Sequence, residues 1–424
     1  MKWFLLVWLC TLATLVQAQT IKHNDIVIGK ADSVTSAVLQ EKRQVWVYVP
    51  AGANDLTYAQ QRYPVLYLLD GDDHFASVVG LVQQLSSVGT NTLCPQMIVV
   101  GIPNTNRTRD LTPTYVASAP GLPAEAVQAS GGGENFTAFL ERELIPYIDA
   151  HYPTTPHRTL VGHSFGGLLV MNTLLHHPSL FENYVALDPS MQWDGQKLLR
   201  EAPGLLARPQ VAGRALFVGI ANTMPTGFDT VQVRRDTSPA TDFMRSKLTL
   251  RDELARHPAN GLRVRTKYYP TDTHNSVPLP ATYDALRFLF AAYAPAPQAL
   301  FDLFEPGVQT QPVAFVEAHY QRVSAAMGYP VLPPEPMVND LAYYLLQSNQ
   351  PAHALAMFQL NVRNYPTSFN AHDSLGDCYR AQGQPTLASA AYTKALQLKD
   401  VPATRQKLSQ LPAPKPAAKR RPRN

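Results

Sequence analysis

The chain has 424 residues, of which 45% are apolar and 16% are charged. It can therefore bury a core and is not an intrinsically disordered protein. The formal net charge is +4, but five basic residues lie in the last ten positions, which leaves residues 1–414 close to neutral. A nearly neutral body lacks the basic surface that nucleic-acid binding requires, and this excludes nucleic acid as an expected partner.

Residues 1–18 have the features of a secretory signal peptide. Lys2 supplies a positive charge, an apolar run extends from Trp3 to Val16, and Ala18 ends a short segment suited to cleavage. The run is too short to span a bilayer comfortably, and no later stretch reaches about 18 apolar residues. We therefore expect an exported protein, periplasmic or secreted, that is cleaved near Ala18 and has no membrane anchor.

Residues 19–295 are predicted to form one α/β domain. Short apolar, β-branched runs alternate with helical patterns, which is typical of a doubly wound, mostly parallel sheet covered by helices on both faces. The expected strands cover residues 44–49, 65–69, 97–100, 159–161, 184–187, 215–220 and 264–269. The expected helices cover residues 136–148, 167–177 and 281–293.

The remainder of the chain is predicted to be a small α-helical region. Residues 296–335 form a proline-rich connector with one helix at 313–327, and residues 401–424 form a basic disordered tail. Between them, residues 336–400 repeat with a period of 34, the length of a tetratricopeptide repeat. Three positions recur in both copies: Leu341, Ala354 and Phe358 return as Leu375, Ala388 and Tyr392. The repeats either bind a protein or peptide partner or only cap the fold.

Ser164 is the predicted nucleophile. It lies in the Gly-x-Ser-x-Gly segment Gly162–Gly166, directly after an expected strand and directly before an expected helix. Such a turn is so tight that side chains at Gly162 and Gly166 would collide with the backbone, and it turns the serine hydroxyl outward. The helix that begins there directs free N–H groups toward the site, so we expect the backbone N–H of Phe165 to contribute to an oxyanion hole.

His274 is the predicted general base. A nucleophile elbow requires a histidine after the last strand, in the chain order serine, acid, histidine, and His274 has this position. The acid is expected just after the strand that ends at Ile220, where Asn222 stands instead of a carboxylate. Asp229 is the preferred candidate. The alternatives are Asp236, Asp242, Asp272 or no acid at all.

Several segments together resemble an esterase family of α/β-hydrolases that contains S-formylglutathione hydrolases and ferric-siderophore esterases. They are residues 69–71, 107–113, the elbow at Ser164, Asp188-Pro189-Ser190 and the His274 loop. The resemblance implies that Ser164 and His274 are nucleophile and base, and that the backbone near Gly71 and Asp72 completes the oxyanion hole. It also implies that a serine–histidine dyad without an acid is an alternative.

The predicted activity is hydrolysis of small-molecule carboxylic esters through an acyl-enzyme on Ser164. No cofactor or metal is expected, because the sequence has no ligand cluster with metal spacing and no phosphate-binding glycine loop after a strand. The alternatives are an acyltransferase or peptidase that uses the same elbow, and a repeat-mediated binding protein with a relic hydrolase domain. Arg107 and Arg109 either bind an acidic substrate group or pair with Asp110.

Overall fold

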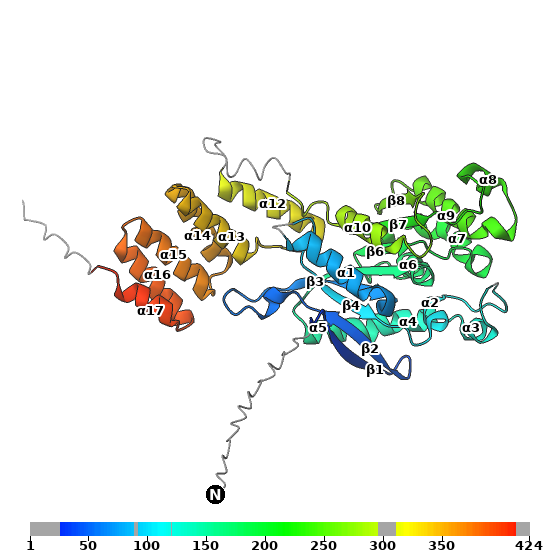
Figure 1. Cartoon of the computed structure of the whole chain (residues 1–424), viewed down its shortest axis with the longest axis horizontal. Helices are drawn as coiled ribbons and strands as arrows, with labels where there is room; N and C mark the ends of the chain where they lie inside the picture. The colour runs from blue at the N-terminus through cyan, green and yellow to red at the C-terminus, as the bar shows by residue number, and fades with distance from the viewer. Residues whose placement is uncertain (1–25, 89–91, 120, 296–310, 413–424) are drawn as a thin grey trace, which may run out of the picture.

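The computed structural model describes residues 26–88, 92–119, 121–295 and 311–412 (Figure 1). The predicted signal peptide and its cleavage site lie outside the described residues, as do residues 296–310 of the connector and residues 413–424 of the tail. The prediction of a disordered tail is wrong for Pro402–Ser409, which form a helix. In the described part of the chain, none of the helices combines the length and apolar character that crossing a membrane would need.

A single eight-stranded sheet forms the centre of the first domain. Its strands follow the order β1-β2-β4-β3-β5-β6-β7-β8, and from β4 to β8 all neighbours are parallel. The bounds are β1 Lys30–Ser36, β2 Glu41–Tyr48, β3 Tyr63–Leu69, β4 Ile98–Ile102, β5 Thr154–His163, β6 Asn183–Leu187, β7 Ala215–Ala221 and β8 Arg263–Tyr269. The seven strands expected from the sequence correspond to β2 to β8, which confirms the α/β-hydrolase-type sheet. β1, which pairs antiparallel with β2, was not predicted.

Helices cover both faces of this sheet, as a parallel sheet buried on two sides requires. One face carries α1 (Gly71–Ser86) and α10 (Pro278–Leu289). The other carries α2 (Arg107–Leu111), α4 (Gly133–Phe139), α5 (Ile145–His151), α6 (Phe165–His176) and α7 (Trp193–Leu206). A π-helical turn at Leu140–Leu144 joins α4 to α5, so the helix expected over 136–148 is present as a continuous segment.

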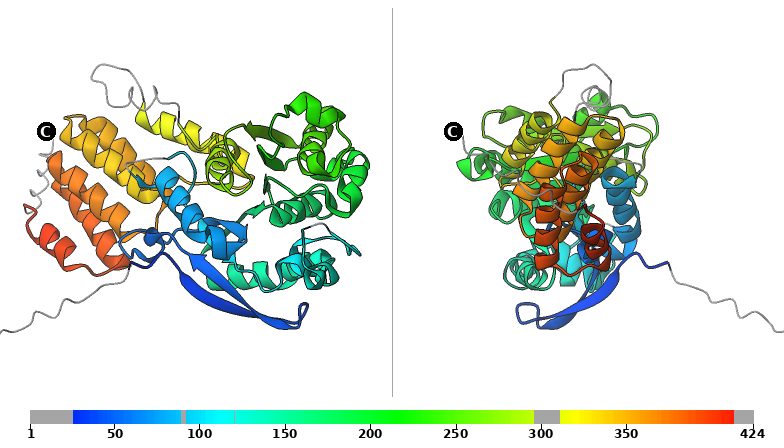
Figure 2. Two further views of the ribbon diagram at one scale, coloured as in Figure 1. Left: turned by 45° about the vertical axis from the view of Figure 1, so that its right-hand side comes forward. Right: turned by 90° about the vertical axis from the view of Figure 1, so that its left-hand side faces the viewer.

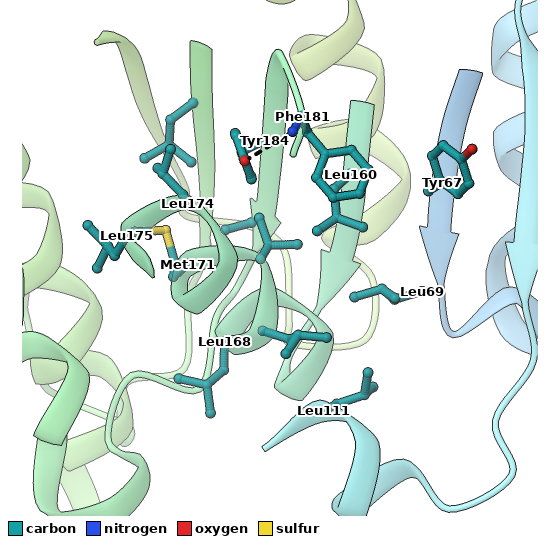
Figure 3. Packing of buried hydrophobic residues seen from close by; sticks show 14 of the residues in the cluster. Tyr67, Leu69, Leu111, Leu160, Leu168, Met171, Leu174, Leu175, Phe181 and Tyr184 are labelled. Carbon is teal, nitrogen blue, oxygen red and sulfur yellow. Dashed lines mark hydrogen bonds between the residues drawn. The ribbon is translucent and has the colours of Figure 1, made fainter. Parts of the chain in front are cut away.

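The core on the α6 side is made of large aliphatic and aromatic side chains. Figure 3 shows Leu168, Met171 and Leu174 of α6 beside strand residues such as Leu160 and Tyr184, and all five are buried. α6 is apolar on every side, with all but its first and last residues buried. Each Å² of apolar surface that is buried stabilises the fold by about 25 cal/mol, so this helix is held firmly against β5 and β6. The position of its first turn, directly after β5, is therefore fixed.

The C-terminal helices stack against one end of the sheet domain (Figures 1 and 2), and their apolar side chains continue the core of the α1 and α10 face. They are α12 (Pro312–Met327), α13 (Glu335–Gln347), α14 (Pro351–Asn364), α15 (Phe369–Ala381), α16 (Pro385–Leu398) and α17 (Pro402–Ser409). The carbonyl of Met327 lies 3.1 Å from Nδ1 of His157, near the start of β5. Glu335 accepts a hydrogen bond of 2.7 Å from the N–H of Ala59, just before β3. The stack therefore docks at the amino ends of the parallel strands.

The opposite edge of the sheet gathers the loops that follow the strands. Because β3, β5, β6, β7 and β8 are parallel, the residues after their carboxyl ends meet at one edge, where open α/β sheets bind their ligands. The loops there carry Asp70, Ser164, Asp188, Asn222 and His274. The C-terminal stack contacts the other edge.

Candidate active site

Ser164 stands in a strained turn between β5 and α6. Its backbone has φ 59° and ψ −114°, a combination that non-glycine residues rarely adopt and that is found at sites where function requires it. A Cβ atom on Gly162 would lie only 2.4 Å from the backbone carbonyl carbon and oxygen of Gly166. Any larger residue at position 162 would therefore force the turn open, which is the steric reason for this glycine.

Hydrogen bonds to the β6 loop hold the backbone of Ser164 in place. Its N–H donates to the carbonyl of Leu187 at 2.9 Å, and its own carbonyl accepts from the N–H of Ser190 at 3.1 Å. The two serine hydroxyl oxygens lie 3.3 Å apart, within hydrogen-bond distance. Ser164 is partly exposed, whereas Ser190 is buried, so of the two hydroxyls the one that a substrate can reach belongs to Ser164.

His274 lies in the loop after β8 and contacts the residue next to Ser164. Its carbonyl oxygen is 2.8 Å from Nε2 of His163, and the two imidazole rings lie 4.4 Å apart between centroids. Phe243 of α9 (Pro239–Arg256) meets the His274 ring edge to face at 5.1 Å. The structure thus brings Ser164 and His274 to the same edge of the sheet, although 110 positions separate them in the chain.

The carboxylate at His274 belongs to Asp188. Its Oδ2 lies 2.6 Å from Nδ1 of His274, and the Asp188 side chain is fully buried while that of His274 is 30% exposed. Oδ1 of the same carboxylate accepts from the N–H of Ala221 at 2.8 Å and from Nζ of Lys247 at 2.6 Å. Every contact of this buried anion is therefore with a donor, and one oxygen is directed to the histidine.

The carboxylates favoured by the sequence have other partners. Asp229 caps α8 (Thr230–Arg235): its Oδ1 accepts from the N–H groups of Val231 and Gln232 at 2.8 and 2.7 Å. A carboxylate used as a helix cap is not aimed at the imidazole, so Asp188 replaces Asp229 as the candidate acid. Asp236 accepts from Thr241 at 2.7 Å, Asp242 pairs with Arg245 at 3.0 Å, and Asp272 accepts from Ser276 at 2.8 Å.

Asn222, which stands where the catalytic acid was expected, joins two loops of the site. Its N–H donates to the carbonyl of Asp272 at 2.9 Å, and its side-chain amide donates to the carbonyl of Pro270 at 3.0 Å. These bonds join the loop after β7 to the loop that carries His274. Asn222 thus holds the histidine loop from one side, while the carboxylate comes from β6 on the other.

Burial and neighbouring charges act in opposite directions on the buried ionisable groups of the site. Burial alone would raise the pKa of the Asp188 carboxyl, but the hydrogen bond from His274 and the charge of Lys247 outweigh it and hold this pKa below its ordinary value. Burial lowers the pKa of the Lys247 ammonium to about 8, with Asp188 acting in the opposite direction. Burial, followed by the nearby His274 and His74, lowers the pKa of His163 to about 4. Asp188 is therefore an anion and His163 a neutral imidazole at pH 7.

The first turns of α1 and α6 lie side by side at the site. A helix begins with N–H groups that have no acceptor inside the helix, and Asp72 and Phe165 occupy such positions in α1 and α6. An ideal Cβ on Gly166 would lie 3.1 Å from Oδ2 of Asp70, which precedes α1. His74 of α1 also meets His163 edge to face at 5.7 Å. The two predicted oxyanion donors therefore lie on adjacent helix starts.

Arg107 links these two helix starts. Its Nε and Nη2 donate to the two carboxylate oxygens of Asp70 at 2.6 and 3.0 Å, and Nη2 also donates to the carbonyl of His163 at 3.2 Å. Arg109 instead pairs with Asp110 at 2.7 Å and Glu41 at 2.8 Å. Both arginines thus make ion pairs within the protein.

Aromatic side chains form a wall beside Ser164. Phe165 meets Trp193 edge to face at 5.1 Å, and the Trp193 indole donates to the carbonyl of Thr114 at 3.0 Å. A cavity of about 220 Å³ is lined by Trp193, Leu168, Lys197 and Glu201 among others, but not by Phe165 or Ser164. In the described ranges no group of three or more histidine, cysteine, aspartate or glutamate side chains is arranged to hold a metal ion.

Comparison with known proteins places these residues in a wider context. Residues 36–210 match a family model described as "Putative esterase". The ferri-bacillibactin esterase BesA of Bacillus subtilis is 34% identical over 149 residues, which are 33% of this chain and 52% of that protein. A siderophore enterobactin esterase of Emericella nidulans is 29% identical over 164 residues, 36% of this chain and 52% of that protein. The chain therefore spans about half the length of the curated relatives that it matches.

A solved structure extends the similarity into the C-terminal helices. An IroE-like serine hydrolase from Shewanella oneidensis is 32% identical, with a TM-score of 0.65, and the match covers 79% of this chain and 99% of that one. An uncharacterised protein from Capnocytophaga ochracea covers 90% of this chain and 98% of its own length with a TM-score of 0.54, but at 19% identity it shows only a shared fold.

Proposed function

The chain belongs to this esterase family of α/β-hydrolases, and on that premise we propose that it hydrolyses carboxylic esters through an acyl-enzyme on Ser164. The observation that carries the proposal is the hydrogen bond of 2.6 Å between His274 and the buried Asp188, placed beside the strained Ser164 turn. A serine hydroxyl is a weak nucleophile unless a base accepts its proton, and an oriented imidazole is the usual base.

In the proposed mechanism Asp188 orients and stabilises the base. Its carboxylate accepts the Nδ1–H of His274, which leaves Nε2 without a proton and able to take the one from Ser164. The Ser164 oxygen then attacks the ester carbonyl, and the imidazolium that forms is stabilised by the Asp188 charge. His274 returns the proton to the leaving alcohol. In the second half of the reaction it activates the water that releases the acid and frees Ser164.

The N–H groups of Phe165 and Asp72 are the proposed oxyanion donors. Both belong to first helical turns, where the helix dipole also favours negative charge. The Arg107 fork ties Asp70 to the backbone of His163 and so keeps the two donors at a fixed separation. This arrangement costs no reorganisation when the carbonyl oxygen becomes an oxyanion.

We propose a small-molecule ester as substrate and a siderophore ester as its first candidate. Two relatives, BesA and the enterobactin esterase, are named for siderophores that they cleave. The aromatic side chains of Phe165 and Trp193 beside Ser164 suit a substrate that presents an apolar or aromatic face.

A screen of p-nitrophenyl esters of graded chain length tests the proposed activity. The wild-type protein should hydrolyse short esters, and Ser164→Ala should reduce kcat by at least about a thousandfold because no nucleophile is left. Ser190→Ala is the matched control, since its hydroxyl is 3.3 Å from that of Ser164 but is buried; it should keep kcat within about tenfold. Equal rates for wild type and Ser164→Ala would contradict the serine mechanism.

The acyltransferase and peptidase alternatives differ in what reacts with the acyl-enzyme. Adding a short alcohol or a peptide amine to the ester assay should leave mostly free acid as product if water is the acceptor. A transferase would yield the new ester or amide instead, even when water is in large excess.

We also propose that the mature protein is exported and that residues 336–400 form tetratricopeptide-like repeats. The N-terminal sequence supports the first proposal, and the helix pairs α13–α14 and α15–α16 with their 34-residue period support the second. Expression with residues 1–18 in the native host, followed by N-terminal sequencing of the secreted or periplasmic fraction, tests export. A mature protein that still begins at Met1 would contradict it.

A further inference from the structure

Lys247 of α9 is fully enclosed beside the proposed active site. Both its side chain and that of Asp188 have no exposed surface, and their charged atoms Nζ and Oδ1 are 2.6 Å apart. Nζ also donates to Oγ1 of Thr223 at 3.0 Å. The face of the Phe243 ring covers it at 3.8 Å from the ring centroid. This lysine therefore has no access to solvent, and its charge is directed at one carboxylate.

A buried ion pair of this kind is poorly explained by stability. The cost of removing two charges from water often exceeds their mutual attraction, and apolar replacements of such pairs are frequently neutral or stabilising. The rest of α9 is an ordinary amphipathic helix with leucines against the core, and an apolar pair in place of both Lys247 and Asp188 would suit that surface as well. The contacts of Lys247 therefore indicate a functional role for its charge.

Lys247 determines which oxygen of Asp188 is free for the histidine. With the Ala221 N–H it holds Oδ1 at 2.6 and 2.8 Å, while Oδ2 is left for Nδ1 of His274. Phe243 contacts both Lys247 and His274: Nζ of Lys247 lies over the face of its ring, and the His274 ring meets it edge to face. The two hydrogen bonds to Oδ1 thus fix the orientation of the carboxylate and keep Oδ2 directed at the imidazole.

We propose that Lys247 is a positioning residue of the esterase site, which holds the Asp188 carboxylate toward His274 and balances its charge. The inference rests on the proposed function, since it presupposes that His274 is the base. The hydrogen bonds of Lys247 go to Asp188 and Thr223 and not to the nucleophile, so its charge acts through Asp188. The proposed catalytic series thus runs from Ser164 through His274 and Asp188 to Lys247.

The charge balance has a consequence for pH dependence. Against the effect of burial, the hydrogen bond from His274 and the charge of Lys247 lower the pKa of the Asp188 carboxyl. Other ionisable groups lie near the histidine. His163 at the end of β5 contacts it, His74 of α1 contacts His163, and Asp272 on the histidine's own loop accepts from Ser276. Near the site Asp70 and Arg107 pair with each other, and the carboxylate of Asp72 in the first turn of α1 accepts from the side-chain amide of Asn104 at 3.1 Å. Of the groups that contact Asp188, Lys247 is the cation.

Removing that cation should let the Asp188 carboxyl take up a proton at higher pH. In Lys247→Met, which keeps the length of the side chain, the acidic limb of the kcat/KM profile should move upward by about one pH unit. At pH 7 kcat should fall about ten- to a hundredfold, with KM within about threefold. Lys267→Met is the matched control, because Lys267 pairs with Asp284 but is half exposed on β8. It should leave both the limb and kcat unchanged.

A double-mutant cycle with Asp188→Asn separates positioning from a general structural role. If Lys247 acts only through Asp188, then Asp188→Asn/Lys247→Met should have the same kcat as Asp188→Asn within about threefold. The double variant also buries no unpaired charge, so it remains available if Lys247→Met alone fails to fold. Melting temperatures and titration of active serines with a fluorophosphonate report the folded fraction of each variant.

These measurements distinguish failure of the positioning role from failure of the proposed function. An unshifted acidic limb in Lys247→Met, or a further tenfold or larger loss in the double variant beyond Asp188→Asn, would overturn the positioning role even though Ser164→Ala is inactive. Full activity of Ser164→Ala in the same assay would instead overturn the proposed function, and the role of Lys247 with it.

Discussion

Replacing Asp188 with asparagine keeps the shape of the side chain but removes its charge. Oδ1 accepts from two donors, the Lys247 ammonium at 2.6 Å and the Ala221 N–H at 2.8 Å. The amide oxygen of an asparagine would be held there, and its NH₂ group would face Nδ1 of His274. The imidazole would then have to accept at Nδ1 and carry its proton on Nε2, the nitrogen that must take the proton of Ser164.

The size of the effect follows from the charge that is lost. Two unit charges about 4 Å apart interact by about 4 kcal/mol at the effective dielectric of ~20 that suits protein sites. This is the stabilisation that the imidazolium would lose in the transition state. Since about 1.4 kcal/mol corresponds to a tenfold change in rate, kcat of Asp188→Asn should fall about a thousandfold. KM should change little, because Asp188 is buried behind the histidine.

Steady-state hydrolysis of p-nitrophenyl acetate, measured with active-site titration, is the appropriate assay. Asp229→Asn is the matched control, since asparagine caps a helix as well as aspartate does and Asp229 caps α8; its kcat should stay within about twofold. The reasoning is refuted if Asp188→Asn keeps more than a tenth of the wild-type kcat, or if Asp229→Asn loses as much as Asp188→Asn.

Three further predictions concern the surroundings of the site. Arg107→Lys keeps the charge but loses the fork on Asp70 at 2.6 and 3.0 Å, so kcat measured in the same assay should fall about tenfold, and an unchanged kcat would argue against a role in placing the oxyanion donors. His163 has a pKa of about 4 in the folded protein, below its ordinary value of about 6.5. As the pH falls from 6.5 to 4 the unfolded chain therefore binds more protons than the folded one, and urea unfolding should show stability decreasing by up to about 3 kcal/mol, a component that His163→Gln should lack. Glu335→Ala removes the buried acceptor of the Ala59 N–H and should lower the melting temperature by several degrees, for about 2 kcal/mol lost, while kcat stays unchanged because the contact lies at the opposite edge of the sheet; a fall in kcat would contradict that placement.

Much of the fold could be predicted because local patterns determine it. The buried parallel strands β3 to β7 appear in the sequence as short apolar runs, and β2 was indicated by its β-branched and aromatic residues. β1 was missed because Lys30–Ser36 is half exposed and contains Lys30, Asp32 and serines, which do not read as an apolar run. The turn at Ser164 was predictable for a steric reason, since an ideal Cβ on Gly162 would lie 2.4 Å from the backbone of Gly166. A Cβ on Gly166 would instead lie 3.1 Å from the side chain of Asp70.

The acid was missed because its identity depends on tertiary distance. Asp188 follows a predicted strand and lies between serine and histidine in the chain, so the signal was present in Asp188-Pro189-Ser190. The acid was instead expected after β7, where the chain has Asn222 and, further on, Asp229. Only the structure shows that the loop after β6, the neighbour of β5, reaches Nδ1 of His274. Lys247 had no signal, since a lysine within an amphipathic helix usually faces solvent.

Covalent labelling of the intact protein with a fluorophosphonate, followed by mass spectrometry of its peptides, tests the central claim most directly. The account predicts one phosphonylated residue, Ser164, in the wild type and in Ser190→Ala, no label in Ser164→Ala, and labelling at least a hundredfold slower in His274→Ala. A label on Ser190 or another residue, or an undiminished labelling rate in His274→Ala, would contradict the assignment of Ser164 and His274 as nucleophile and base.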